Sequence, residues 1–304
     1  LTFMYRITDQ GSAGYLVTMI VYLWPLVAFL PTLFPFKKSL ENEKEPQWTT
    51  YAVCACCALF CCNCEQICVA AIMTWGMIVL YTYLQSKRIN KLYCMLLLIA
   101  FAHLVFITTC PGNTARTASE ITRLPSFEHF SFIRKIGLCI GSPIVKYMVV
   151  TWQSLIVWAF SVILPLTVFL KNKKAYIPLL VSLIPFGLLL FSFFKFDPVF
   201  TILHETTAGQ LAYICTISVA FYGSIFFSLF YIGKDEESII AKYAPLFIFF
   251  VGFTTRACLG ITISFLEMAR TFFLLEYAMI AISIMFMTRH ISNWTGKSKK
   301  VNLV

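Results

Sequence analysis

Residues 209–232 read GQLAYICTISVAFYGSIFFSLFYI, and this stretch decides the class of fold because no charged side chain occurs in it. A transmembrane helix needs about 20 consecutive apolar residues, since each residue adds about 1.5 Å and the hydrocarbon core is about 30 Å thick. The stretch therefore predicts a helix that crosses a membrane.

The rest of the 304-residue chain has the same character. Hydrophobic residues make up 59% and charged residues 12%, and the mean hydropathy is +0.80. Soluble domains average about 45–50% apolar and about 25% charged residues, so this chain has too few charges to coat a water-soluble particle. We therefore expect an integral membrane protein in contact with the lipid bilayer, and no nucleic-acid partner.

Long apolar segments recur along the whole chain and predict an all-α transmembrane helix bundle of about seven to nine spans, with residues 1–304 in one transmembrane domain. The segments lie near residues 13–36, 51–86, 93–110, 143–170, 176–194, 209–232, 243–266 and 271–289. Segment 51–86 is too long for one upright helix. We expect residues 65–86 to span and residues 51–62 to form a half-length segment before them. One long loop is expected, between residues 110 and 143, and the other connections are expected to be short.

The distribution of Lys and Arg predicts the orientation of the bundle. The C-terminal tail and the loops at 87–92, 171–175 and 233–242 carry about twice as many basic residues as the loops on the opposite side. Because cytoplasmic loops carry an excess of Lys and Arg, we expect a cytoplasmic C-terminus. No organelle address is recognised at the end of the chain, and the plasma membrane is the default location.

Ionisable side chains at membrane depth are the candidate substrate-binding residues, because they are costly there and mark pathways or pair with one another. These residues are Arg256, Glu276, Lys146 and Glu65. Arg256 lies near the middle of its span and Glu276 lies in the last span, so the two either neutralise each other or form a site. Lys146 and Glu65 lie nearer the interfaces and can extend toward the headgroups.

A cysteine cluster lies within segment 51–86. The candidate lipidation sites are Cys54, Cys56, Cys57, Cys61, Cys62 and Cys64. Cysteines beside an apolar span accept S-palmitoyl groups or serve as small packing residues. A structural zinc site needs four ligands, and no histidine lies near the cluster, so we expect no metal site.

Enzyme motifs were not found in the sequence. The four histidines are far apart, and GxSxG, HExxH and P-loop patterns do not occur. We therefore expect neither an enzyme nor a bound cofactor. Glycines such as Gly252 and Gly260, or Gly137 and Gly141, predict close approach of neighbouring helices.

Three stretches of the second half resemble the organic solute transporter alpha-subunit family. They are Phe132-Ile133-Arg134-Lys135 with Val145-Lys146, residues 217–231 with Ile240-Ala241-Lys242-Tyr243-Ala244, and Leu274-Leu275-Glu276 through Arg289-His290. Cys64-Glu65 is similar to an acidic residue that opens an earlier span in that family. The cysteine cluster departs from the family pattern, because it precedes the span that carries the glutamate.

The resemblance implies facilitated transport of amphipathic organic anions or steroid-like solutes, and a small single-span partner subunit. Arg256 and Lys146 would then attract an anionic headgroup, and Glu276 would orient one of them. A receptor-like protein, or a channel-forming or non-catalytic subunit of a larger membrane complex, fits the same hydropathy. The sequence leaves these alternatives open.

Overall fold

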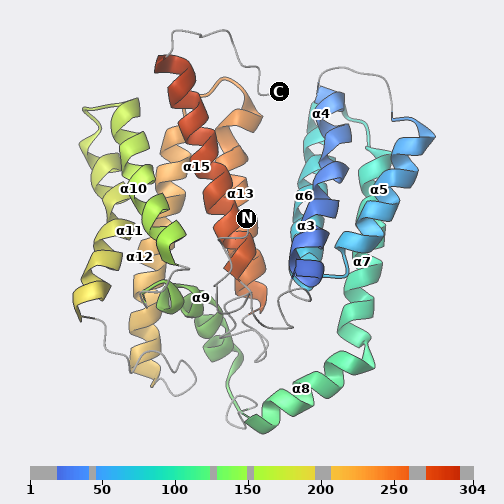
Figure 1. The fold of residues 1–304 in the computed structure, drawn as a ribbon, viewed down its shortest axis with the longest axis horizontal. Coiled ribbons are helices and arrows are strands. Elements are labelled where there is room, and N and C mark those ends of the chain that lie inside the picture. Colours follow the sequence, from blue (N-terminus) through green and yellow to red (C-terminus); the bar gives the residue numbers. More distant parts are fainter. Residues whose placement is uncertain are drawn as a thin grey trace. The chain divides into compact units, whose positions relative to one another are not determined.

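The computed structural model describes residues 19–40, 46–123, 129–148, 154–195, 207–259 and 272–294. The regular structure of these residues is helical throughout, which confirms the all-α class (Figure 1). Their contacts form two compact units. Unit 1 lies within residues 1–119 and unit 2 within residues 120–303. The single transmembrane domain expected from the sequence stays a prediction.

Four helices in the described part of the chain are long and apolar enough to cross a membrane. They are α6 (Glu65–Ser86), α7 (Lys91–Thr109), α12 (Ala208–Gly233) and α13 (Ile239–Leu259). The protein is thus an integral membrane protein by length and composition of its helices. The expected C-terminal tail lies outside the described residues, and the seven to nine spans and the orientation stay predictions.

Capping residues explain where these helices begin and end. Lys87 adopts a left-handed φ of 56° and closes α6, the conformation that commonly follows a helix C-terminus. The side chain of Asn90 accepts a hydrogen bond from the backbone N–H of Tyr93 and opens α7. Thr207 and Gln210 form a reciprocal capping box at the start of α12, which satisfies backbone donors that a helix N-terminus leaves without partners.

The half-length segment expected before residue 65 is a separate helix. α5 (Trp48–Cys61) is followed by a turn at residues 62–64, and α6 begins at Glu65. The side-chain amide of Asn63 donates to the carbonyls of Leu59 and Phe60. These bonds satisfy carbonyls that the helix end leaves open, so the turn is a capped helix end.

The described residues of the stretch 143–170, which was expected to form one span, belong to two helices. α9 (Phe132–Met148) and α10 (Ser154–Lys171) share these residues and run in different directions (Figure 1). α9 therefore begins inside the stretch expected to be a loop. The first part of that stretch is also helical, as α8 (Pro111–Arg123).

The amphipathic pattern of α9 explains the difference. Leu138 and Val145 are buried two helical turns apart, whereas Arg134 and Lys135 interrupt the apolar residues near the start of the helix. A helix that buries one stripe of side chains has apolar residues at a spacing of three to four. A search for uniformly apolar runs detects spanning helices and overlooks this pattern.

Unit 1 begins with a helical segment that changes its hydrogen-bond pattern along its length. The segment comprises η2 (Met19–Leu23, a π-helical turn), α3 (Trp24–Phe29), η3 (Leu30–Leu33, a 3-10 turn) and α4 (Phe34–Leu40). Pro25, Pro31 and Pro35 lie within it. Because proline lacks a backbone N–H and crowds the preceding turn, it interrupts regular α-helical bonding.

Thr32 joins this segment to the rest of unit 1. The indole Nε1 of Trp75 donates to the Thr32 hydroxyl at 3.1 Å, and the Tyr93 hydroxyl donates to the Thr32 carbonyl at 2.9 Å. The Thr32 hydroxyl donates in turn to the carbonyl of Phe29. All of these polar groups are buried, and each bond offsets the cost of removing its groups from water.

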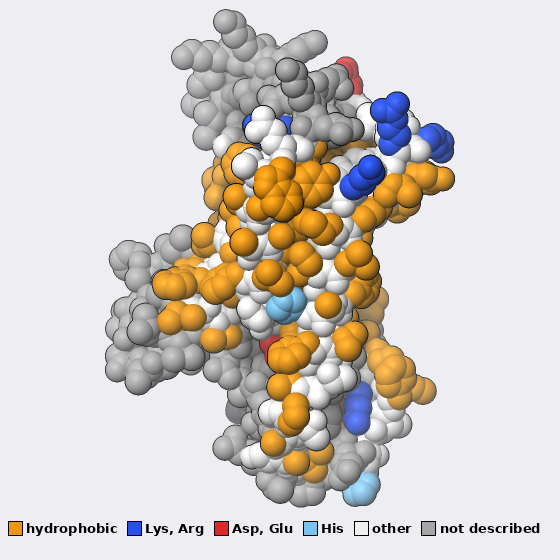
Figure 2. All heavy atoms as spheres, turned by 90° about the vertical axis from the view of Figure 1, so that its right-hand side faces the viewer, with side chains coloured by type: hydrophobic (Ala, Val, Ile, Leu, Met, Phe, Trp, Pro, Cys, Tyr) orange, Lys and Arg blue, Asp and Glu red, His pale blue; other side chains and the backbone are white. Residues whose placement is uncertain are grey.

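The outer face of α7 is suited to contact with lipid. Leu98, Val105 and Phe106 are between 61% and 71% exposed. Figure 2 shows a face of the molecule where hydrophobic side chains form an almost continuous surface and most Lys and Arg side chains lie near the upper end. In water such a surface would drive aggregation, whereas hydrocarbon solvates it.

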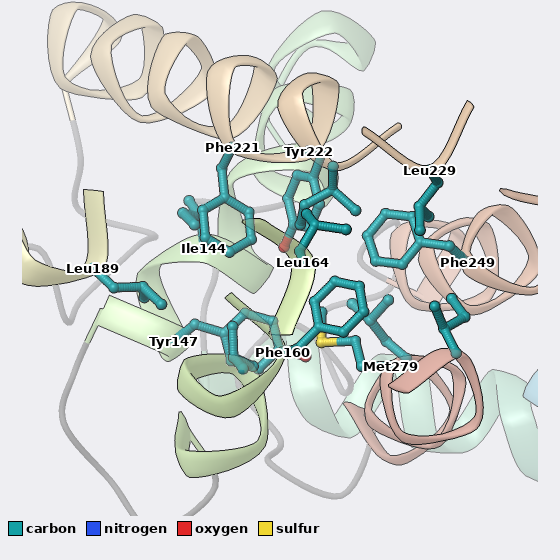
Figure 3. Packing of buried hydrophobic residues seen from close by; sticks show 14 of the residues in the cluster. Ile144, Tyr147, Phe160, Leu164, Leu189, Phe221, Tyr222, Leu229, Phe249 and Met279 are labelled. Carbon is teal, nitrogen blue, oxygen red and sulfur yellow. The ribbon is translucent and has the colours of Figure 1, made fainter. Parts of the chain in front are cut away.

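Unit 2 is built around α12, which packs against α9, α10, α11 (Tyr176–Lys195) and α13, while α15 (Phe273–Trp294) packs against α10 and α13. Its core is rich in aromatic rings (Figure 3). Phe160 of α10 and Phe249 of α13 stack with ring centroids 6.2 Å apart and an interplanar angle of 8°. Tyr222 of α12 contacts Phe253 of α13 with centroids 4.6 Å apart.

Glycines on α9 allow its close approach to α12, as the sequence predicts. A Cβ atom added at Gly141 would lie 2.7 Å from Cγ2 of Ile214, and one added at Gly137 would lie 3.2 Å from Cδ2 of Leu211. The four-residue spacing places both glycines on the same face of α9. Larger residues would push the two helices apart.

An ion-pair cluster fixes one end of unit 2. Nζ of Lys171, the last residue of α10, donates to two backbone carbonyls at the C-terminus of α12 at 3.0 and 2.7 Å. It also lies 2.9 Å from Oδ2 of Asp235 in the turn that follows. Nη1 of Arg289 on α15 lies 3.0 Å from Oε1 of Glu236 in the same turn. The turn between α12 and α13 is therefore tied to two other helices.

We expect Gly233→Ala to destabilise unit 2 and Gly223→Ala, in the same helix, to stabilise it. A Cβ atom at Gly233 would collide with the backbone carbonyl of Lys242, whereas nothing lies near the corresponding position at Gly223. Alanine is favoured over glycine in an open helix by about 0.5–1 kcal/mol. Thermal unfolding of the purified full chain in detergent checks both changes. A Gly233→Ala protein as stable as Gly223→Ala would contradict the close contact.

The ion pair between Lys171 and Asp235 predicts that the stability of the folded protein depends on pH in the acid range. The hydrogen bond from Lys171, and the positive charges of Lys171, Lys234 and Lys242, hold the pKa of Asp235 below its ordinary value of 3.8. A carboxylate whose pKa is lowered on folding stabilises the protein above the unfolded pKa, and this contribution is lost as the pH falls through the folded pKa.

We therefore expect the melting temperature of the Asp235→Asn protein to fall less than that of the wild type as the pH drops below 3.8. Because Asp235 is fully exposed, the difference should be small. Glu237→Gln, at an exposed position of the same turn, serves as the control and should follow the wild type. Identical acid profiles for wild type and Asp235→Asn would exclude a contribution from the Lys171–Asp235 pair.

Candidate functional site

Arg256 is the centre of the candidate site. Its side chain is completely buried, although α13 is one of the helices that can cross a membrane. The guanidinium lies over the ring of Phe272, with Cζ 4.3 Å from the ring centroid. An aromatic face attracts a cation most strongly where water is excluded, so this contact offsets part of the cost of burial.

Close approach of α13 and α15 brings Arg256 to Phe272. A Cβ atom at Gly252 would lie 3.0 Å from Cβ of Ala278 and 3.1 Å from Cα of Leu275, both on α15. Arg256 follows Gly252 by one helical turn and so lies on the same face of α13. The close contact predicted at Gly252 is thereby confirmed, and it directs Arg256 toward the start of α15.

Two buried tyrosines face the same region from other helices. Tyr147 of α9 and Tyr222 of α12 are 2% and 3% exposed, and both lie within electrostatic range of Arg256. The ring of Tyr147 also packs edge-on against Phe272, with centroids 5.3 Å apart. Figure 3 shows both tyrosine side chains pointing into the same aromatic core.

The hydroxyl groups of these tyrosines have an unusual property. Both oxygen atoms are buried, and neither has a hydrogen-bond partner among the described residues. Buried polar side chains are nearly always hydrogen-bonded in native proteins. Two such exceptions within electrostatic range of one buried guanidinium make this region the candidate site.

Glu276 belongs to the same group of residues but does not pair with Arg256. The Glu276 side chain is 6% exposed, and none of the ion pairs between described residues joins it to Arg256. Its carboxyl lies instead within electrostatic range of Tyr147 and Tyr277. An Arg256–Glu276 ion pair is therefore not among the ion pairs of the described residues, and a binding role for either side chain stays a prediction.

The other two candidate substrate-binding residues, Glu65 and Lys146, are not among the described side chains near Arg256. Glu65 is the first residue of α6 in unit 1, where it is half-buried. The backbone of Lys146 belongs to α9, directly before Tyr147, but its side chain lies outside the described part of the structure. The site is therefore built from Arg256, Glu276 and residues that the sequence did not single out.

Tyr147 and Tyr222 were missed because nothing in the sequence separates them from the many other aromatic residues of the chain. Phe272 was missed for the same reason. The available signal was the position of Tyr147 beside Lys146, a residue already noted as ionisable. Only the packing of α9 against α12 shows which tyrosines meet Arg256.

The cysteine cluster lies mostly in the interior of unit 1. Among the candidate lipidation sites, Cys54, Cys61, Cys62 and Cys64 are buried, Cys57 is half-buried and Cys56 is exposed. The sulfur atoms of Cys61 and Cys62 lie 4.0 Å apart, and the Cys68 thiol donates to the carbonyl of Ala100 at 3.4 Å. Burial leaves Cys56 and Cys57 as the accessible thiols, and their lipidation stays a prediction.

The described residues contain no group of three or more His, Cys, Asp and Glu side chains placed to hold a metal ion. The small volume of the thiols instead suits the close packing of α5, α6 and α7, where Ala70, Ala71 and Ala100 are also buried. Small residues let helices approach closely within a bilayer.

Comparison of the chain with protein-family models, with curated proteins and with solved structures gives no match. The resemblance noted from the sequence therefore stays a prediction, and the site must be interpreted from its own geometry.

We expect Gly252→Val to destabilise unit 2 by about 1–3 kcal/mol, the usual cost of forcing extra volume into a packed interior. Gly187→Val on α11 is the matched control, because nothing lies near a Cβ atom at that position. Thermal unfolding in detergent measures the difference. Equal melting temperatures for the two variants would show that α13 and α15 do not depend on this contact.

Proposed function

We propose that the protein is a membrane carrier of amphipathic organic anions, including steroid-like solutes, and that unit 2 binds the anionic group at Arg256. The observation that carries this proposal is the complete burial of Arg256 in a helix long and apolar enough to cross a membrane. Ionisable groups at membrane depth are costly and are associated with substrate and ion pathways.

The chemistry of the guanidinium favours an anion as the bound group. It carries five N–H donors in a fixed plane and does not lose its charge in proteins. Carboxylate, sulfate and phosphate groups accept two of these donors at once, and such charge-assisted bonds are about twice as strong as neutral ones. An anion at Arg256 also reduces the electrostatic cost of burying its charge.

The surroundings of Arg256 favour an apolar body attached to the anion. The rings of Phe272, Phe253 and Phe249 lie around Tyr147, Tyr222 and the guanidinium. Ligand sites commonly combine apolar and aromatic side chains with a few polar groups that fix the orientation. A solute with a flat apolar skeleton and one charged end matches this composition.

The partner subunit and the plasma-membrane location are part of the same proposal and come from the sequence resemblance and from the default location. A receptor-like protein or a channel-forming subunit would also carry apolar helices. The carrier is preferred because it gives a role to the polar side chains that α9, α12 and α13 bury in unit 2.

We expect Arg256→Gln to lower uptake of a radiolabelled steroid sulfate by about tenfold to a hundredfold, because a hydrogen bond to a charged group contributes about 1.5–3 kcal/mol. Arg256→Lys should retain part of the uptake, since lysine keeps the charge and loses the planar fork. Uptake into cells is measured at equal surface expression.

Arg88→Gln is the control, because Arg88 is an exposed basic residue of the loop between α6 and α7. Normal uptake by Arg256→Gln at wild-type surface expression would remove Arg256 from the site and with it the main support for an anion carrier.

A further inference from the structure

The hydroxyl groups of Tyr147 and Tyr222 serve no packing purpose that phenylalanine would not serve equally well. The rings fill the core and contact Phe272 and Phe253, and those contacts need no oxygen. A buried hydroxyl without a partner costs about 1–3 kcal/mol. Phenylalanine at either position would therefore give a more stable ligand-free protein.

Neither hydroxyl is satisfied by the charged groups nearest to it. The Tyr147 oxygen lies within electrostatic range of both Arg256 and Glu276, and the Tyr222 oxygen lies within range of Arg256. Neither oxygen forms a hydrogen bond with a described residue. Tyr147 and Tyr222 thus present two hydroxyl donors within electrostatic range of Arg256 that the described residues do not engage.

One helix contact fixes both donors. Tyr147 lies near the C-terminal end of α9, and Tyr222 lies on α12, against which α9 packs through Gly137 and Gly141. Because these glycines bring the two helices into close contact, the positions of the two hydroxyls relative to each other do not depend on a flexible loop. Donors held in place before binding lose little entropy when a ligand arrives.

We infer that Tyr147 and Tyr222 are specificity-determining residues whose hydroxyls donate hydrogen bonds to the oxygen atoms of the anion at Arg256, so that the site selects an oxyanion. The ligand class is an organic sulfate, sulfonate or carboxylate, whose oxygens together accept from the guanidinium and from both hydroxyls. This inference rests on the proposed function and adds the two residues that recognise the anion by its oxygens.

The test compares Tyr147→Phe and Tyr222→Phe with Tyr243→Phe, a change at an exposed position of α13. The purified full chain is used in detergent. The first measurement is the melting temperature without ligand, and the second is the affinity for a radiolabelled steroid sulfate and for the parent steroid alcohol. Inorganic sulfate is the third probe and reports on the anion alone.

We expect the ligand-free melting temperatures of Tyr147→Phe and Tyr222→Phe to equal or exceed that of the wild type. Each variant should bind the steroid sulfate about tenfold more weakly, as expected for the loss of one hydrogen bond to an anion. Affinity for the steroid alcohol should not change. Tyr243→Phe should match the wild type in every measurement.

A lower ligand-free melting temperature in either core variant would overturn the inference, because the hydroxyl would then have a structural partner. Unchanged affinity for the steroid sulfate would also overturn it, while binding by the wild type would leave the proposed function intact. If the wild-type protein bound neither the steroid sulfate nor inorganic sulfate, the proposed function and the inference would both be wrong.

Discussion

Unit 2 buries one positive charge, and its packing has to offset the free-energy cost of that burial. Arg256 is completely enclosed among apolar helices, and the transfer of a charged group from water into such surroundings costs several kcal/mol even after relaxation. The guanidinium lies over the ring of Phe272, and Tyr147 and Tyr222 lie within electrostatic range of it. These contacts come from four separate segments of the chain, so the site exists only when those segments are packed together.

Close helix contacts supply that packing. Gly252 brings α13 to α15, and Gly137 with Gly141 brings α9 to α12. At the other end of α12, Lys171 and Arg289 hold the turn that leads into α13. The helices that carry Arg256, Tyr147 and Tyr222 are thus fixed by contacts that do not involve the site itself. Such an arrangement allows the site to keep polar groups that lower the stability of the ligand-free protein, as functional sites often do.

The sequence predicted the parts of this structure that depend on local composition. The uniformly apolar run at 65–86 became α6 with the expected bounds. Gly137, Gly141 and Gly252 lie at helix contacts as expected, and Gly260 lies outside the described residues. The rarity of charges inside apolar runs singled out Arg256 and Glu276, which are buried on two helices of unit 2 that pack together. The sequence predicts these features because each depends on the amino-acid composition of one helix.

The features that the sequence did not predict depend on contacts between distant segments. α9 was taken for a loop and the start of a span because Arg134 and Lys135 interrupt its apolar residues. Tyr147 and Tyr222 are ordinary aromatic residues until α9 and α12 place them beside Arg256. The division of contacts into two compact units was not foreseen either, since both units have the same hydrophobic composition.

An experimental density map of the full chain in lipid nanodiscs with a bound steroid sulfate would show directly where the anion binds. We expect density for the sulfate group beside the Arg256 guanidinium, within hydrogen-bond distance of the Tyr147 and Tyr222 hydroxyls. Ligand density at another place, with these hydroxyls bonded to protein groups, would contradict it.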